Sequence, residues 1–397
     1  MTSVFLHRIT NELPSNMSDS TTASRAPQLP GNKHHLWRPF AFLLILFPIL
    51  PAIFLFHLDS LDPAELPLHE LTDRPPVVAQ RVNSHMLDGS ERLGEPKLPG
   101  PEDIAYDPES GIIYTGCADG WVRRVRLNDS TVEEWVNTGG RPLGLVLGPH
   151  KEVIVTDTEK GLLRLSENGT VELLTDEAEG VKFKLADGVD VAEDGTIYFT
   201  DASYKYGLNE ATRDLLEGRP HGRLMSYCQK TKQTNVLVRD LYFANGVAVS
   251  PNQEFVVFCE TNMNRCKKYY ISGMKSGTVD EFIDHLPGMP DNIRYDGEGH
   301  YWIALTKGNT NTFTWELVLK YPFIRKALWI LQKYLSLPYQ GNGGALMVDL
   351  EGNLIAHYYD SRCTLVTGCL KIGNHLYCGS LIHAYITRLD LTLHGAL

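Results

Sequence analysis

The amino-acid sequence predicts an all-β fold, a six-bladed β-propeller, preceded by a single N-terminal transmembrane helix. Three observations support this prediction. A short phrase recurs six times between residues 100 and 381, the stretches between its copies have the pattern of two further strands, and residues 40–56 form an uncharged apolar run. Since each blade of a propeller is one four-stranded sheet, a repeat of this kind is typical of that fold.

The apolar run at residues 40–56 reads FAFLLILFPILPAIFLF, and His57 and Leu58 extend it slightly. Its length is at the short end of what crosses the hydrocarbon core of a membrane. Lys33 and Arg38 precede the run and three acidic residues follow it, so the positive-inside rule places the preceding chain in the cytosol. A cleaved signal peptide and a buried core helix are the alternatives, but no A-x-A-like site follows and no polar face interrupts the run.

This orientation predicts a single-pass membrane protein of the secretory pathway, in the endoplasmic reticulum, the vacuole or the plasma membrane. Its C-terminal domain would be lumenal or extracellular, which makes two Asn-x-Ser/Thr sites, at Asn128 and Asn168, available for glycosylation. The predicted segments are a disordered cytosolic tail (1–39), a transmembrane signal anchor (40–58), a stalk (59–96) and the propeller (97–397).

The recurring phrase combines a short alternating strand, a polar turn and a second strand rich in β-branched or aromatic residues, which indicates a hairpin. Residues 97–397 allow about 50 residues per blade, in the upper range of propeller repeats. A two-sheet sandwich would also contain many short strands, but it does not predict one phrase recurring six times. The copies are GPEDIAYDPESGIIYTG (100–116), RPLGLVLGPHKEVIVTD (141–157), LADGVDVAEDGTIYFTD (185–201), FANGVAVSPNQEFVVFCE (243–260), MPDNIRYDGEGHYWIAL (289–305) and VTGCLKIGNHLYCGSL (366–381).

Two long insertions interrupt the repeat, at residues 203–222 in the third blade and 306–343 in the fifth. Both fall between the second and third strands of a blade, and this loop returns to the face on which the innermost strand begins. Long loops on such a face are usual places for lids and specificity elements. The second insertion has helical apolar spacing with basic residues, which fits a lid, a surface that touches lipid headgroups, or a helix packed on the propeller rim.

The residues that open the repeats would ring the mouth of the central channel and supply only oxygen ligands. Hard cations, calcium above all, take six to eight oxygens, whereas zinc would need histidine or cysteine ligands that this ring lacks. Three carboxylates in a partly dry channel would repel one another without a cation. The alternative is that Asp-Gly and Asn-Gly are ordinary turn dipeptides here. The predicted calcium ligands are Glu102, Asp187, Asn245, Asp291 and Asn292.

Composition and missing motifs exclude several functions. The formal net charge of −11 argues against a nucleic-acid-binding protein, which needs a basic surface. The sequence has no G-x-S-x-G, H-E-x-x-H or phosphate-binding G-x-x-x-x-G-K motif. His221 could reach the channel mouth, although a solvated loop histidine is the preferred interpretation. Cys259 and Cys266 could bridge across a hairpin in an oxidising lumen or simply pack together.

Several phrases together resemble one family. GPEDIAYD, ADGWVRRV, RPLGL, FANGVAVSPNQEFVVFCET and LPGMPDNI, in this order, are similar to the strictosidine synthase-like / adipocyte plasma membrane-associated protein family, over residues 97–397. The resemblance implies a six-bladed propeller related to paraoxonases and gluconolactonases. It also implies the same five calcium ligands, with Asp187 at a place where paraoxonases have asparagine. In gluconolactonases the position that matches Asp291 holds the metal and is proposed as a general base.

The sequence also departs from these relatives. Leu143 stands where the second-blade P-H-G phrase of paraoxonases has histidine. Strictosidine synthase needs a glutamate in the segment leading into the last blade, and residues 361–368 contain no carboxylate. We therefore expect a calcium-dependent, arylesterase-like hydrolase of esters or lactones with an apolar part, with Asp291 as the candidate catalytic base. A non-catalytic binding or scaffolding propeller with a structural metal is the alternative, and amine–aldehyde condensation by a strictosidine synthase is less favoured.

Overall fold

The structure is a computed structural model that describes residues 49, 51–68, 71, 75–308, 317–335 and 341–397. The chain divides into two compact units, Met1–Leu55 and Phe56–Leu397. Most of the predicted anchor at 40–58 lies outside the described residues, although residues 51–58 are helical. Within the described ranges, no helix has the length and apolar character needed to cross a membrane.

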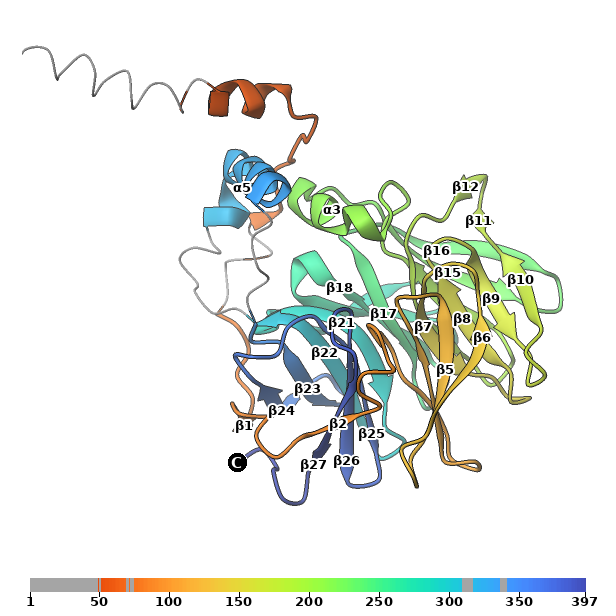
Figure 1. The fold of residues 1–397 in the computed structure, drawn as a ribbon. Helices are drawn as coiled ribbons and strands as arrows, with labels where there is room; N and C mark the ends of the chain where they lie inside the picture. The colour runs from red at the N-terminus through yellow and green to blue at the C-terminus, as the bar shows by residue number, and fades with distance from the viewer. Residues whose placement is uncertain (1–48, 50, 69–70, 72–74, 309–316, 336–340) are drawn as a thin grey trace, which may run out of the picture. The chain divides into compact units, whose positions relative to one another are not determined.

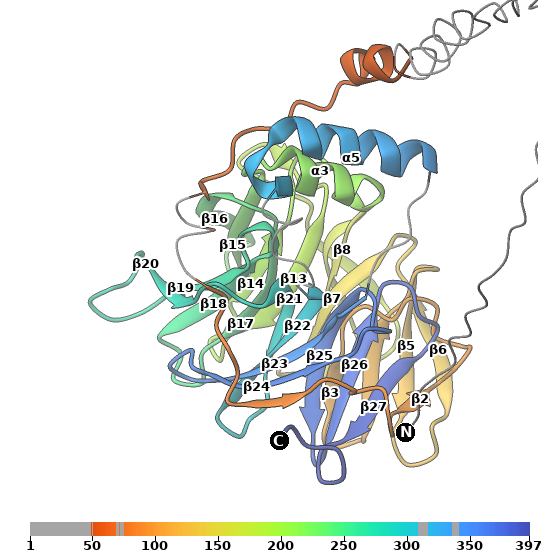
Figure 2. The same ribbon diagram turned by 90° about the vertical axis from the view of Figure 1, so that its left-hand side faces the viewer.

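The second unit contains six antiparallel sheets arranged around a common axis (Figures 1 and 2), which confirms the predicted six-bladed propeller. All six recurring phrases form the first and second strands of a blade. Blades one to three comprise β3 (Ala105–Asp107), β4 (Ile112–Gly116), β5 (Trp121–Arg126) and β6 (Val132–Asn137); β7 (Pro142–Leu147), β8 (Val153–Asp157), β9 (Gly161–Leu165) and β10 (Val171–Thr175); and β13 (Ala186–Val191), β14 (Ile197–Asp201), β15 (Gly222–Cys228) and β16 (Gln233–Leu241).

The remaining blades follow the same order. Blades four to six comprise β17 (Ala244–Val249), β18 (Phe255–Glu260), β19 (Arg265–Tyr270) and β20 (Val279–Ile283); β21 (Gly288–Tyr295), β22 (His300–Gly308), β23 (Gly344–Asp349) and β24 (Leu354–Tyr359); and β25 (Val366–Ile372), β26 (His375–Ser380) and β27 (Ile386–Asp390). A small hairpin, β11 (Glu177–Ala178) with β12 (Val181–Lys182), precedes the third blade.

The hydrophobic core is divided among the contacts between neighbouring blades. Six clusters of buried apolar side chains each join two adjacent sheets; Phe199 and Met225, for example, pack against Ile154 of the preceding blade. This explains why the inner strands are apolar on both faces, because each blade is covered by a sheet on either side. The sequence repeat therefore corresponds to a repeated packing unit, in which each pair of neighbouring blades encloses one apolar cluster.

The segment before the first repeat closes the ring. Strand β2 (Glu91–Leu93) pairs with β27 and supplies the fourth strand of blade six, while β1 (Arg81–Asn83) adds a parallel fifth strand to blade five. Part of the segment predicted as a stalk is therefore built into the propeller. The physical reason is that β27 would otherwise present an unpaired strand edge, which native sheets avoid.

The inner strands approach one another closely at glycines. A Cβ atom added to Gly246 would lie 2.5 Å from both Asn292 Cα and Ile293 N of the next blade. Such a contact with backbone atoms cannot be relieved by a side-chain rotation, so the two blades would have to separate.

We expect Gly246→Ala to destabilise the protein by about 1–3 kcal/mol, because it overpacks the junction of blades four and five. Chemical denaturation of the purified protein measures this change. Gly207→Ala is the matched control, because its nearest contact would be Lys184 O at an ordinary 3.6 Å. Equal stability of the two variants would contradict the close approach.

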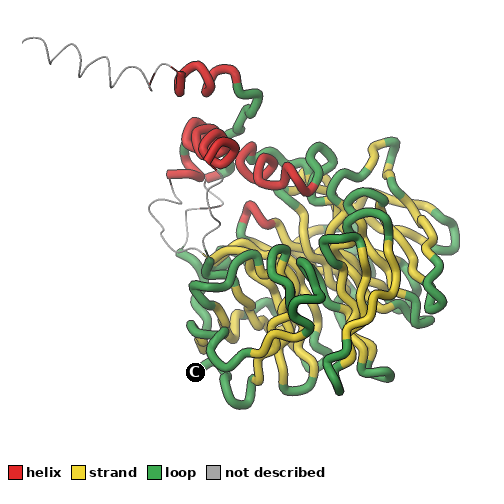
Figure 3. Tube along the Cα trace, in the orientation of Figure 1, coloured by secondary structure: helices red, strands yellow, loops and turns green. Residues whose placement is uncertain are grey.

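The two insertions form helices on one face of the propeller. Helix α3 (Ala211–Glu217), preceded by the short helix η2 (Leu208–Glu210), belongs to the first, and α5 (Pro322–Leu335) to the second. A further short helix, η3 (Thr261–Met263), follows β18. Figure 2 shows α5 lying across α3, and Figure 3 shows both helices on the same side of the strands.

Two disulfides connect paired strands. Cys259 and Cys266, opposite each other in β18 and β19, are bonded, so the bridging interpretation of the sequence is confirmed. The second bridge, Cys369–Cys378, joins β25 and β26 and was not predicted.

The other three cysteines, Cys117, Cys228 and Cys363, are free thiols. We therefore expect an alkylating reagent to modify three of the seven cysteines in the denatured, unreduced protein and all seven after reduction. Mass spectrometry of the two samples gives the count. Seven modified cysteines without reduction would show that neither bridge forms.

Candidate metal centre

The five predicted ligands lie together at the centre of the propeller, and all are almost fully buried. Glu102 precedes β3, and the other four lie on the innermost strands of blades three, four and five. Oxygen atoms from the three carboxylates lie within 4.8 Å of one another. The grouping inferred from the repeat positions is therefore present in the structure.

Bulges in the inner strands explain how these side chains reach the axis. In each of β13, β17 and β21 the pairing register shifts around the ligand residues, so that two residues oppose one on the neighbouring strand. A bulge of this kind redirects a side chain out of the regular alternation. Asp187-Gly188 and Asn245-Gly246 therefore lie in bulges at the start of β13 and β17 and not in turns between strands. The shifts fall between Ala186 and Val189, Ala244 and Val247, and Pro290 and Ile293.

Four oxygens of the cluster have no hydrogen-bond partner although they are buried. They all accept hydrogen bonds or bind cations, and none is a donor. Two carboxylates of the cluster do accept hydrogen bonds: Asn292 Nδ2 donates to Glu102 Oε1 at 2.8 Å, and the Asn245 side chain donates to Asp291. Because an unpaired buried oxygen is costly, a converging set of them fits a hard cation such as calcium. The four atoms are Glu102 Oε2, Asp187 Oδ1, Asn245 Oδ1 and Asn292 Oδ1.

The electrostatics of the cluster favour the same ligand. Burial, and then repulsion from Asp187, raise the pKa of Glu102 well above its usual range, and burial with repulsion from Glu102 does the same for Asp291. Burial, with repulsion from Asp103 and Asp201, raises the pKa of Asp187 to about 8. A divalent cation would offset both effects, because it compensates the negative charge that burial penalises.

Threonine hydroxyls of adjacent blades fix the backbone at the ligands. Thr200 Oγ1 donates to Asn245 O at 2.6 Å, Thr367 Oγ1 to Glu102 O at 2.7 Å, and Thr156 Oγ1 to Asp187 O. Sequence analysis did not identify these residues. The signal was available for two of them, since Thr156 and Thr200 both stand before an aspartate at the end of a recurring phrase.

A buried ion pair separates the cluster from the opposite face of the disc. Arg294 contacts Asp103 and donates to Val189 O and Leu145 O, both at 3.0 Å. This arginine also lines a second, more polar cavity on that opposite face. The candidate metal centre is therefore reached from the face that carries α3.

A cavity of about 790 Å³ lies directly over the cluster, with Glu102, Asp187, Asn245 and Asp291 in its wall. Much of the remaining wall is apolar. The first insertion contributes to the wall, whereas α5 packs behind α3 and does not line the cavity. The apolar lining residues are Leu143, Leu185, Leu208, Ala211, Leu215, Phe243, Met289, Leu365, Leu381 and Ile382.

Three cationic residues, Arg141, Lys184 and Lys307, border this cavity. Arg141 is buried beside Glu102, donates to Gly100 O at 3.0 Å, and has its pKa lowered by burial. Burial also lowers the pKa of Lys307. No histidine is among the described residues that line the cavity.

His221 does not reach the channel mouth and is not solvated, so both interpretations of this residue are wrong. It is buried, and its Nδ1 atom lies 2.8 Å from Asp214 Oδ1. Ser203 Oγ donates to the same oxygen at 2.7 Å. These contacts connect α3, which carries Asp214, to both ends of the first insertion, and none of the three residues lines the cavity.

The other positions singled out in the sequence lie as follows. Leu143, at the place of the paraoxonase histidine, lines the cavity with an apolar side chain. Leu365, in the segment 361–368, does the same. Asn128 and Asn168 are exposed in the turns after β5 and β9, on the face opposite the metal centre. Both side chains are open to solvent, as an acceptor asparagine requires.

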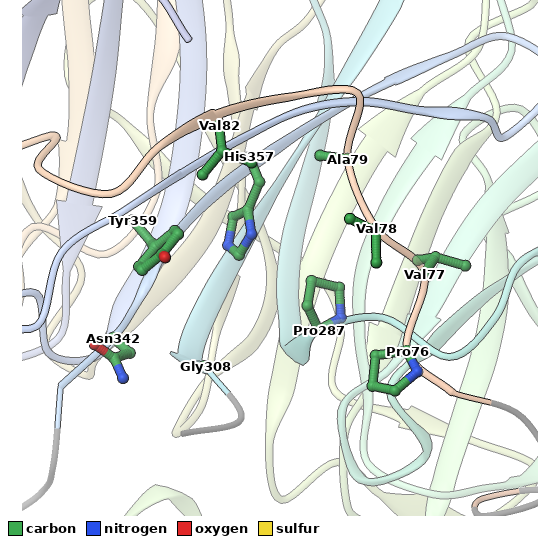
Figure 4. Close-up of a pocket in the computed structure, with 10 residues that line it drawn as sticks. All are labelled: Pro76, Val77, Val78, Ala79, Val82, Pro287, Gly308, Asn342, His357 and Tyr359. Carbon is green, nitrogen blue, oxygen red and sulfur yellow. The ribbon is translucent and has the colours of Figure 1, made fainter. Parts of the chain in front are cut away.

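A separate pocket of about 430 Å³ lies at blade five, beside the segment that leads to β1 (Figure 4). The rings of His357 and Tyr359 contact each other there in a tilted arrangement, with centroids 4.6 Å apart, next to Val82. Burial lowers the pKa of His357 to about 4, so this imidazole is neutral at physiological pH. No carboxylate and no second histidine lines this pocket in the described part of the chain, which leaves it without a metal-ligand set.

Comparisons with known proteins identify the family. Profiles of strictosidine synthase and of the strictosidine synthase-like N-terminal region match residues 187–274 and 83–125. The chain is 54% identical over 363 residues to protein strictosidine synthase-like 6 of Arabidopsis thaliana, covering 90% of this chain and 96% of the relative. The chain belongs to the strictosidine synthase-like family.

This strictosidine synthase-like protein is also similar to animal proteins and to solved propellers. It is 33% identical over 406 residues to the adipocyte plasma membrane-associated protein of Bos taurus, covering 94% of this chain and 96% of the relative. A gluconolactonase structure from Xanthomonas campestris superposes with a TM-score of 0.55 at 16% identity, covering 84% of this chain and 99% of that chain. The structural match shows a shared fold.

Proposed function

We propose that this protein is a calcium-dependent hydrolase of esters or lactones that carry an apolar part. The observation that supports this most is the set of unpaired, buried oxygens in the wall of a largely apolar cavity. Hydrolysis of such substrates needs a site that binds an apolar group next to a centre that stabilises developing negative charge. The fold shared with a gluconolactonase is consistent with this chemistry.

Glu102, Asp187, Asn245, Asp291 and Asn292 would hold the ion. A bound divalent cation polarises a carbonyl oxygen and lowers the pKa of a coordinated water. Asp291 is the candidate general base, since its carboxylate faces the cavity beside Glu102 and Asp187. The apolar wall orients the substrate and excludes water around the acyl or alkyl group.

Turnover of aryl esters and lactones, with and without a calcium chelator, tests this function. We expect chelation to abolish turnover and Asp291→Ala to reduce it strongly. Asp280→Ala, at a half-buried position on β20 that does not line the cavity, is the control and should keep full activity. Equal rates for the wild-type protein and Asp291→Ala would disprove the metal-dependent mechanism.

A binding or scaffolding propeller with a structural calcium ion is the second candidate. The absence of histidine from the described cavity wall favours it, because the cavity then lacks the most common general base. In that case calcium would raise the melting temperature without turnover on a broad ester and lactone panel. Strictosidine synthase activity is the third candidate, and formation of product from tryptamine and secologanin would establish it.

The membrane topology belongs to this proposal: a single pass near residues 40–58 and a lumenal or extracellular propeller in the secretory pathway. Its support is the apolar run, the two disulfides, and the exposed sites at Asn128 and Asn168. Disulfides persist in oxidising compartments. Digestion of the native protein with a glycosidase should reduce its mass, and an unchanged mass would count against this orientation.

A further inference from the structure

Helix α5 presents two different faces, and one of them contacts the rest of the unit. Arg325 is buried and donates to Glu217 O at 3.3 Å and to Ala64 O, which ties α5 to the end of α3 and to the chain before it. Trp329 Nε1 donates to Asp59 Oδ2 at 3.3 Å, and Lys333 Nζ lies 3.5 Å from the same oxygen. Since these three residues are spaced four apart, they form one face of the helix.

The opposite face of α5 is apolar and exposed. Phe323, Leu331 and Leu335 repeat at helical spacing, and Tyr334 lies beside them. The exposed fraction is 59% for Phe323, 43% for Leu331, 63% for Leu335 and 58% for Tyr334. A soluble protein seldom exposes such a continuous apolar stripe without a function. We call these four residues the outer stripe of α5.

Basic side chains lie close to aromatic rings along this helix. Lys320 Nζ is 5.6 Å from the ring centroid of Tyr321, and Lys333 Nζ is 5.5 Å from that of Tyr334. Apolar residues bordered by lysines are typical of a helix that lies in the plane of a membrane surface, where lysines reach the headgroups. Asp59 is the acidic group that faces Lys333, and its side chain is largely buried against the face of α5 that carries Arg325 and Trp329.

The chain enters this unit directly beside α5. Lys326 Nζ lies 5.2 Å from the ring centroid of Phe56, and Leu58, near the end of the apolar run, is 64% exposed. Asp59, the first charged residue after that run, is the residue that α5 binds. A segment apolar enough to enter a bilayer therefore ends at this helix, which favours a bilayer over another protein as the occupant of the outer stripe.

We infer that the outer stripe of α5 lies on a phospholipid bilayer, with Phe323, Leu331, Tyr334 and Leu335 inserted at the headgroup boundary. Helix α3, which lines the cavity, then lies between the membrane surface and the metal centre. The turns with Asn128 and Asn168 are on the opposite face, so glycans there would not obstruct this contact. The inference depends on α5 and residues 56–59, and not on metal binding or hydrolysis.

The test uses the full chain in phosphatidylcholine–phosphatidylglycerol vesicles with an environment-sensitive fluorophore on single introduced cysteines. Leu331→Cys reports on the outer stripe, and Met274→Cys, fully exposed after β19 on the opposite face, is the matched control. Both carry Cys228→Ser, because that free thiol is only half-buried. Leu335→Cys is the second reporter if Leu331→Cys does not fold.

We expect brominated lipids to quench the label at position 331 by roughly twofold or more, and to leave the label at position 274 unchanged. Equal quenching at both positions would overturn the inference. A label at position 331 that is shielded from aqueous iodide but not quenched by brominated lipid would also overturn it, because a second copy or another protein would then cover the stripe.

Discussion

Glu102→Gln is expected to raise the stability of the calcium-free protein and to weaken calcium binding at least about tenfold. Glutamine keeps the acceptor for Asn292 Nδ2 but removes a buried carboxyl group whose ionised form is disfavoured by burial and by repulsion from Asp187. The calcium-free protein gains stability because the cost of burying or protonating this carboxyl group disappears, whereas the cation loses a charged ligand. Few ligand substitutions shift apo and bound stabilities in opposite directions, so this result would be specific to a cation site.

Thermal melting with and without calcium, together with calorimetric titration, measures both effects. Glu159→Gln is the matched control, because Glu159 is exposed and lines the same cavity outside the ligand cluster. The control should retain the calcium affinity of the wild-type protein. Loss of apo stability in Glu102→Gln would mean that the carboxylate has a structural role and that the cluster is not a cation site.

The calcium-free protein is expected to become less stable as the pH rises towards about 8. The pKa of Asp187 is raised to about 8 in the folded state, so the folded protein holds a proton that the unfolded chain has released. The contribution of this group to stability is therefore fully present below its unfolded pKa, near 4, and is lost as the pH rises through 8. The raised pKa values of Glu102 and Asp291 act in the same direction.

The change can reach on the order of 5 kcal/mol for a carboxyl group with a shift of this size. Denaturation curves between pH 5 and 8, with chelator or with saturating calcium, test it. Saturating calcium should remove most of the pH dependence, because cation binding displaces the protons. A calcium-free protein whose stability rises over this range would contradict the raised pKa values.

The blade architecture was predictable because each blade contains the same local signal. The first two strands alternate about a polar turn, and six copies in order determine both the number of sheets and the positions that face the axis. The five ligand positions followed from this topology, since residues at equivalent places in a propeller meet at its centre. The sequence did not distinguish a bulge from a turn at the Asp-Gly and Asn-Gly pairs, because both structures use the same residue types.

Other features depend on contacts between distant residues and had no local signal. The three residues of β2 do not show a strand pattern, and their partner β27 lies nearly at the other end of the chain. The Cys369–Cys378 bridge depends on the register of β25 and β26, which spacing alone does not give. Burial of His221 against Asp214 depends on how the first insertion folds back beneath α3.

Closure of the ring by β2 has a consequence for the order in which the protein can fold during synthesis. Residues 91–93 leave the ribosome early, but their partner β27 ends at Asp390, and Leu397 pairs with Val82 through two backbone hydrogen bonds. Five blades can form while β2 stays unpaired, and the disc closes only after β27 has been synthesised. A nascent chain stalled before residue 386 is therefore an open ring with two exposed sheet edges, the form in which chaperones would meet it.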